Sequence, residues 1–167
     1  MTTDTIIAGG ALALSLYGIY ATSRHNRLSV TPFIFGMRCK VTDHHGLTIA
    51  YDIFNHGTGP AKITGFILLT KDKPLPEGKG DPIERWIRDH VGDKVKYQMK
   101  SHRNLGQNYS LMPGTSCRII EAYFPGAKPS DLDQIEKTFD GLDIRIEYQS
   151  FYGLKFAFDT RTEKTSA

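Results

Sequence analysis

The sequence predicts a mainly β fold, an antiparallel β-sandwich that follows one N-terminal transmembrane helix. Three observations predict it. Residues 5–23 contain no charged side chain. Beyond them, apolar residues recur with a period of two, as in strands that bury one face. Turn-forming residues separate about six to eight such segments, with two short helical segments among them, which is more typical of a sandwich than of alternating strands and helices.

The bulk composition bounds the protein's class. The 167 residues suffice for one domain with an appendage and a sizeable core. Lys and Arg number 21 against 18 Asp and Glu, an excess too small and too scattered to indicate a nucleic-acid partner. Cys39 and Cys117 are far apart and lack CxxC spacing, so they predict no zinc site. The sequence does not decide whether the two cysteines form a disulfide or remain reduced, buried thiols.

Thr5–Ser23 is long enough to cross a bilayer, since 19 helical residues span roughly 28 Å against a hydrocarbon core of about 30 Å. Tyr17 and Tyr20 lie near its C-terminal end, where interfacial tyrosines are favoured. The preceding MTTD lacks Lys and Arg and no A-x-A site follows, which disfavours a cleaved signal peptide. We therefore interpret residues 1–28 as a transmembrane anchor with its flanks, 29–160 as the sandwich and 161–167 as a flexible tail.

The charges beside the apolar segment predict its orientation. Asp4 precedes the segment, and Arg24, His25 and Arg27 follow it. The positive-inside rule then places the C-terminal domain in the cytoplasm. The difference is only a few charges, so a periplasmic or extracellular domain stays the alternative.

The first strands follow the anchor. Val30–Met37 is predicted as an edge strand, because Pro32 cannot donate a hydrogen bond to a central ladder. Asp43–Gly46 predicts a turn, and Leu47–Phe54 alternates as a half-buried strand does. Ala61–Thr70 is strongly apolar, so we expect a strand covered on both faces.

The middle of the chain is broken by turn residues. Lys71–Gly80 predicts a loop, and Asp81 and Pro82 then predict the N-cap and first residue of a short helix. Val91–Asn108 is basic and its structure stays open. The predicted buried stripe of the short helix is Ile83, Trp86, Ile87 and His90.

The last third contains the clearest pattern. Ser116–Phe124 predicts a strand, and Pro129–Phe139 predicts a second helix whose N-terminus resembles a capping box of Ser130 and Asp133, with Leu132, Ile135 and Phe139 as its apolar face. The final segments, Leu142–Gln149 and Leu154–Phe158, alternate around a turn at Gly153 and predict a terminal hairpin.

Phe54–Ala61 (FNHGTGPA) lies between two predicted strands and predicts a structural corner. Asn55 is expected to bond to nearby backbone in an Asx-type turn. Gly57 and Gly59 are expected to supply φ angles closed to other residues, and Pro60 to end the corner. The corner is interpreted as scaffold rather than as a binding site.

This strand–N-x-G-x-G-P-A–strand pattern resembles the immunoglobulin-like modules of bacterial proteins, including CARDB-type adhesion-related domains. The anchor and the hairpin Tyr148–Phe156 (YQSFYGLKF) are similar to those of uncharacterised bacterial proteins with one N-terminal transmembrane helix. The resemblance leaves residues 71–140 uncovered. It implies an immunoglobulin-like β-sandwich with two short helical insertions, tethered to the cell inner membrane, and brings no catalytic residues.

The sequence does not predict an enzyme, a metal site or a cofactor. Asp43, His44 and His45 match the DHH string of a phosphoesterase family, but the further carboxylates and histidines of such a site are missing. No G-x-S-x-G, Walker or Rossmann motif is present. The strand settings of Cys39 and Cys117 favour burial over nucleophilic reactivity.

Basic residues gather in Val91–Asn108, the region whose structure the sequence does not predict. Lys94, Lys96, Lys100 and Arg103 are candidate contacts for anionic lipid or for an acidic partner. A solvated loop, neutralised by nearby acidic residues, is the alternative.

The sequence therefore predicts a non-enzymatic, single-pass membrane protein that presents a sandwich for protein–protein interaction, as an accessory subunit or scaffold of a membrane complex. The edge strand Val30–Met37 offers a route to a partner by strand addition. The alternative is an outward-facing module that binds glycan, peptide or peptidoglycan; it predicts a Cys39–Cys117 disulfide and an aromatic concavity that uses Trp86. A small hydrolase is the third hypothesis, and the oligomeric state stays open.

Overall fold

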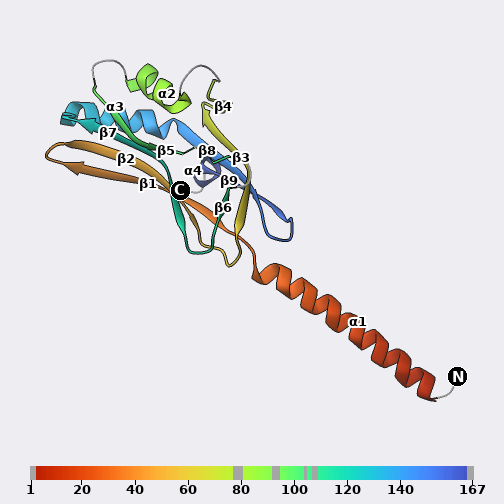
Figure 1. Cartoon of the computed structure of the whole chain (residues 1–167). Helices are drawn as coiled ribbons and strands as arrows, with labels where there is room; N and C mark the ends of the chain where they lie inside the picture. The colour runs from red at the N-terminus through yellow and green to blue at the C-terminus, as the bar shows by residue number, and fades with distance from the viewer. Residues whose placement is uncertain (1–2, 77–80, 92–94, 104, 107–108, 165–167) are drawn as a thin grey trace.

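The protein consists of a long N-terminal helix and a β-rich domain with short helices. Helix α1 (Thr3–Ser29) projects from one end of the domain (Figure 1). In the described part of the chain, no helix combines the length and the mean hydropathy expected of a membrane span. The computed structural model describes residues 3–76, 81–91, 95–103, 105–106 and 109–164, except the side chains of residues 4–6, 129 and 163–164.

The strands form two antiparallel sheets, which confirms the mainly β class. The first sheet has the order β1-β2-β7-β5, and the second the order β4-β3-β8-β9, with β6 paired to the first two residues of β3. The strands of the first sheet are β1 (Ile34–Asp43), β2 (Gly46–Asn55), β5 (Gln98–His102) and β7 (Ser116–Pro125). Those of the second are β3 (Ala61–Thr70), β4 (Lys73–Pro74), β6 (Ser110–Leu111), β8 (Leu142–Gln149) and β9 (Lys155–Asp159).

One hydrophobic core serves both sheets. Ile49 and Ile53 of β2 and Phe124 of β7 contribute from the first sheet, and Ile63 of β3 and Ile146 of β8 from the second. These side chains are at most 2% exposed. The period-two patterns of β2 and β8 therefore bury one face of each strand, as the sequence predicts.

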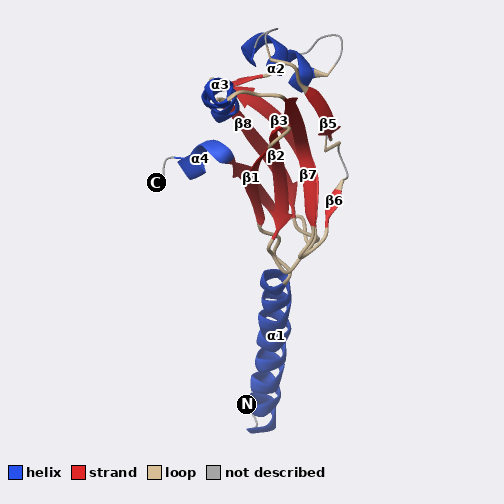
Figure 2. Cartoon of the chain, turned by 90° about the vertical axis from the view of Figure 1, so that its left-hand side faces the viewer, coloured by secondary structure: helices blue, strands red, loops and turns tan. Residues whose placement is uncertain are grey.

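Helices α2 (Pro82–Val91) and α3 (Pro129–Asp140) lie at the end of the sheets remote from α1 (Figure 2). The predicted N-cap of α2 forms, because the Asp81 carboxylate accepts the Ile83 N–H at 2.8 Å. Trp86 of α2 packs edge-on against Phe139 of α3, with ring centroids 5.6 Å apart. The two helices thus cover that end of the core.

Two details of the helices differ from the sequence predictions. His90 is exposed, and Val91 closes the buried stripe of α2, because the helix extends one residue beyond the histidine. At the start of α3, Asp131 rather than Asp133 turns back, and its carboxylate accepts the Lys128 N–H at 3.0 Å.

Three strand predictions also need correction. The first strand begins at Ile34 rather than Val30, because residues 30–33 form a linker that bonds to the corner. β3 is not covered on both faces, since Lys62 and Thr64 are exposed. The predicted loop 71–80 contains the short strand β4, which a turn with positive φ at Lys71 and Asp72 joins to β3; residues 77–80 lie outside the described residues.

The predicted tail begins with a short helix, α4 (Thr160–Lys164). Thr160 is buried, donates to Asp143 Oδ1 at 3.1 Å and accepts the Ile144 N–H at 3.0 Å. The next residue, Arg161, bonds to Asp159 at 2.9 Å. These contacts dock α4 on β8, whereas residues 165–167 lie outside the described residues.

The Asp159–Arg161 pair gives the stability of the domain a pH dependence. The Arg161 guanidinium, helped by the Arg161 N–H, holds the pKa of Asp159 below its ordinary value, against the opposing effect of burial. A carboxylate with a lowered pKa stabilises the fold above its unfolded pKa, and this contribution is lost as the pH falls through the folded pKa. We expect Asp159→Asn to reduce the free energy of unfolding by about 1 kcal/mol at pH 7, and by progressively less below about pH 4.

Urea unfolding of the chain at about pH 7 and at about pH 3 measures this effect. The matched control is Asp133→Asn, which changes an exposed carboxylate on α3. A constant difference between Asp159→Asn and wild type across the pH range would contradict the prediction.

Candidate functional site

The end of the domain that joins α1 brings together segments that are distant in sequence (Figure 2). We call it the helix-proximal end. It consists of the linker 30–33, the corner 55–61, the β6–β7 loop 112–115 and the tip of the β8–β9 hairpin, residues 150–154.

The Asn55 carboxamide lies at the centre of this end and is fully buried. Its Oδ1 accepts the N–H groups of Phe33, at 3.2 Å, and of Gly57, at 3.0 Å. Its Nδ2 donates to the carbonyls of Gly59, at 2.8 Å, and of Leu111, at 2.9 Å. Both donors and both acceptor positions of the amide are used, so the group is saturated. The bond to Gly57 is the Asx-type turn that the sequence predicts.

The linker is also held through its backbone. The Thr31 carbonyl accepts the Thr58 N–H at 3.0 Å, and the Phe33 carbonyl accepts the His56 N–H at 2.8 Å. The linker therefore runs along the corner as a bonded strip, and α1 leaves the domain in a defined direction.

The Tyr148 hydroxyl continues this strip into the second sheet. It accepts the Ile34 N–H at 3.3 Å, and burial raises the pKa of Tyr148. Its ring stacks on Phe156 of β9, with centroids 5.5 Å apart. The base of the terminal hairpin is thereby attached to the first residue of β1.

Gly57 and Gly59 have a different role from the predicted one. Neither adopts a positive φ. A Cβ at Gly59 would lie 2.0 Å from the Val30 carbonyl oxygen, and one at Gly57 would lie 2.4 Å from the Thr31 carbonyl oxygen. The glycines therefore allow the linker backbone to approach the corner, and Pro60 follows, half-buried.

Large apolar side chains are exposed at the helix-proximal end. Tyr152, in the hairpin tip, lies beside the C-terminal half of α1, where a shallow groove is lined by Tyr152 and helix residues from Ser15 to Asn26. Figure 1 shows this hairpin extending toward α1. The exposed apolar residues of this end are Phe33, Met112, Phe151, Tyr152 and Leu154.

Helix α1 has no polar face over its apolar segment. Leu14, Ile19 and Tyr20 are all exposed. Since each residue advances about 100° around the axis, these three side chains point to three different sides of the helix. Such a helix usually lies in a protein core or in a membrane.

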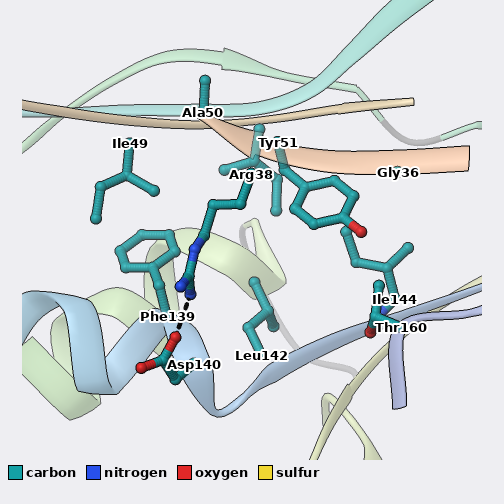
Figure 3. Close-up of a pocket in the computed structure, with 11 residues that line it drawn as sticks. Gly36, Arg38, Ile49, Ala50, Tyr51, Phe139, Asp140, Leu142, Ile144 and Thr160 are labelled. Carbon is teal, nitrogen blue, oxygen red and sulfur yellow. Dashed lines mark hydrogen bonds and ion pairs between the residues drawn. The ribbon is translucent and has the colours of Figure 1, made fainter. Parts of the chain in front are cut away.

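A cavity of about 270 Å³ lies between the sheets and α3, toward β1 (Figure 3). Its walls are mainly apolar, with Ile49, Phe139 and Leu142 among them. At one side Arg38 points to Asp140, and their charged atoms are 2.5 Å apart. The lining contains no His, Cys or Ser, and its volume is near the small end of ligand pockets.

The basic candidates lie elsewhere. Lys96 and Lys100 are exposed, and the Lys100 ammonium lies 4.5 Å from the Tyr123 ring centre, in the half of the first sheet remote from α1. Arg103 contacts Cys117, and hydrogen bonding with Tyr109 and then the contacts with Cys117 raise its pKa. Lys96 and Lys100 lie toward the far end of the first sheet, whereas the Arg103 side chain reaches Cys117, two residues after the loop 112–115 of the helix-proximal end. Lys94 lies outside the described residues.

The cysteines are free. Cys39 lies on β1 and Cys117 on β7, with β2 between them. Neighbouring strands are about 4.8 Å apart, so the two Cα atoms are about 10 Å or more apart, beyond the roughly 7 Å limit for a disulfide. The disulfide predicted by the outward-facing alternative is therefore wrong. Trp86 is largely buried against Phe139, and it contributes with His90 to the lining of a surface pocket between α2 and α3.

Among the described residues, no group of His, Cys, Asp and Glu could hold a metal ion. In the Asp43–Gly46 turn, the Asp43 carboxylate accepts the N–H groups of His45, at 2.7 Å, and Gly46, at 2.9 Å. The first of these bonds is the main cause of the lowered pKa of Asp43. The DHH string is thus part of a tight turn.

The chain matches no known protein family, no curated protein and no solved structure.

The sequence analysis missed the exposed aromatic pair at the hairpin tip. Phe151 and Tyr152 were interpreted as turn residues only. Their signal was available, because two adjacent aromatic residues are unusual in a turn that Gly, Asn, Asp and Ser normally form.

We expect Gly59→Ala to lower the free energy of unfolding by about 2 kcal/mol or more, because the added methyl group forces the linker away from the corner. Urea unfolding of the chain measures the effect. The control is Gly106→Ala, where a Cβ would meet nothing within 4 Å. Equal stability of the two variants would contradict the proposed close approach.

Proposed function

We propose that the protein is a non-enzymatic, single-pass membrane protein that presents an immunoglobulin-like domain for protein–protein contact, as an accessory subunit or scaffold of a membrane complex. The observation that carries the proposal is α1, a 27-residue helix that projects from the domain with apolar side chains exposed on every side.

The length and charge of α1 support insertion in a bilayer. At about 1.5 Å per residue it spans roughly 40 Å, which covers the hydrocarbon core and part of both headgroup regions. Its sequence is uncharged from Thr5 to Ser23. The side chains of Thr5 and Ile6, at the start of this stretch, lie outside the described residues. Burying one large apolar side chain contributes about 1.5–3 kcal/mol, so lipid or another helix covers α1 more favourably than water does.

The strand order supports the immunoglobulin-like assignment. The orders β1-β2-β7-β5 and β4-β3-β8-β9 correspond to the A-B-E-D and C′-C-F-G orders of immunoglobulin-like domains. Helices α2 and α3 are then insertions before strands D and F of that scheme. This arrangement displays sheet edges and loops for contacts.

The edge strand β1 supports contact with a partner protein. In the described sheet it pairs with β2 alone. Phe35, Met37 and Val41 alternate along it and are exposed. An apolar edge strand is a site where a partner can add a strand, and a domain held at the membrane meets other membrane proteins at raised effective concentration. Of the predicted edge strand Val30–Met37, only residues 34–37 belong to β1.

The flanking charges support a cytoplasmic domain at the inner membrane. Arg24 and Arg27 follow the uncharged stretch, whereas Asp4 precedes it. The absence of a Cys39–Cys117 disulfide removes one support for the outward-facing alternative.

Extraction with alkaline carbonate tests the anchor. We expect the wild-type chain to stay with the membrane pellet and the double variant Leu12→Lys, Leu16→Lys to enter the supernatant, because a lysine at the centre of a span costs about 3 kcal/mol. The control Leu12→Ile, Leu16→Ile should stay in the pellet. Release of the wild-type chain by carbonate would refute membrane anchoring.

Photo-crosslinking tests the partner surface. A photoreactive amino acid in place of Val41 should give a discrete adduct with one membrane protein in native membranes, since this side chain is exposed and belongs to the edge strand. The same group in place of Glu84, exposed on α2, serves as the control. Identical adduct patterns at both positions would count against β1 as the contact surface.

A further inference from the structure

The turn between β8 and β9 has an unusual surface for a water-exposed loop. Phe151 is 78% exposed, Tyr152 45% and Leu154 41%. Three of the five residues between the two strands are therefore large, apolar and in contact with solvent. The rings of Phe151 and Tyr152 meet edge to face, with centroids 5.6 Å apart, so the pair forms one compact apolar tip.

The tip lies beside the segment of α1 that is predicted to enter the membrane. Tyr152 shares a groove with Gly18, Ile19 and Thr22, among other residues of that helix. If the uncharged stretch ends at Ser23 at the hydrocarbon boundary, Gly18 lies about 7 Å inside it. Interfacial aromatic and apolar groups are buried to a similar depth, about 5–10 Å.

We propose that the tip of the β8–β9 hairpin, through Phe151, Tyr152 and Leu154, inserts into the interfacial region of the bilayer that α1 crosses. This inference rests on the proposed anchoring by α1. The hairpin is then a second membrane contact, which fixes the orientation of the domain relative to the bilayer plane.

The surroundings of the tip match an interfacial segment. Lys155 is opposite Gln149 at the base of the hairpin, and Lys62 of β3 is opposite the same Gln149 on the other side. Both lysines are exposed. They form a cationic pair behind the apolar tip, where ammonium groups meet lipid phosphates while aromatic rings lie deeper.

Two further exposed side chains lie at the same end. Phe33 belongs to the linker that follows α1, and Met112 belongs to the loop whose Gly114 N–H bonds to the Asn55 carbonyl at 2.8 Å. The linker is hydrogen-bonded to the corner, and Tyr148 at the hairpin base is hydrogen-bonded to Ile34 of β1. The helix and the apolar tip consequently enter the bilayer as one rigid unit.

Depth-dependent fluorescence quenching tests the proposal with the full chain in proteoliposomes of phosphatidylethanolamine and phosphatidylglycerol. The chain carries Cys39→Ser, buried Cys117 is left in place, and an environment-sensitive NBD probe is attached after Phe151→Cys. The control is His44→Cys, at the β1–β2 turn, ten residues of strand away from the helix-proximal end. Leu12→Cys reports separately on α1.

We expect blue-shifted emission at position 151 and at least twofold stronger quenching by shallow spin-labelled lipids there than at position 44. Position 12 should be quenched most by deep spin labels. Lipid exposure at 12 with water exposure at 151 would overturn the hairpin inference and leave the anchor standing. Water exposure at 12 would overturn both. An apolar signal at 151 that spin-labelled lipids do not quench would show a protein contact at the tip, and would equally overturn the inference.

Discussion

The arrangement of the whole molecule depends on one buried carboxamide. Asn55 bonds to the linker, to its own corner and to β6, and no other side chain offers two donors and two acceptors in so short a group. Glutamine would place the amide one methylene too far, and aspartate would lose the donors that Gly59 and Leu111 require. The glycines of the corner serve the same junction, because they let the linker approach closely enough for Phe33 to reach Asn55.

This junction gives the domain two unlike ends. At the far end, α2 and α3 cover the core, and Trp86 and Phe139 pack together beneath them. At the helix-proximal end no helix among the described residues covers the sheets, and exposed apolar side chains lie near the C-terminal end of α1 instead. The exposed surface of this end makes sense if a membrane lies against it. The cavity near Arg38 lies between these two ends, among β1, β2 and α3.

The elements that follow a local rule could be predicted from sequence. Alternation alone locates β2 and β8, and Asp81 marks the start of α2. The predictions fail where the cause is non-local. Gly59 was assigned a φ requirement because its actual neighbour, Val30, is 29 positions earlier in the chain. The helix α4 depends on a bond from Thr160 to Asp143, which no period in the sequence reveals. The two adjacent aromatic residues of the hairpin turn are unusual in sequence, but their exposure depends on what the rest of the fold leaves uncovered.

Because the linker is hydrogen-bonded to the corner, α1 and the domain are expected to move together rather than independently. A flexible linker would let the domain sweep a hemisphere above the bilayer and meet partners at any height and angle. Here a tilt of α1 would be transmitted to the far β1–β2 turn, ten strand residues beyond the junction, so a small change of helix angle would move that turn by a much larger arc. The edge strand β1 would then meet partner proteins at one distance from the bilayer and in one orientation. Changes in bilayer thickness, which tilt spanning helices, would then alter which partners the edge can reach.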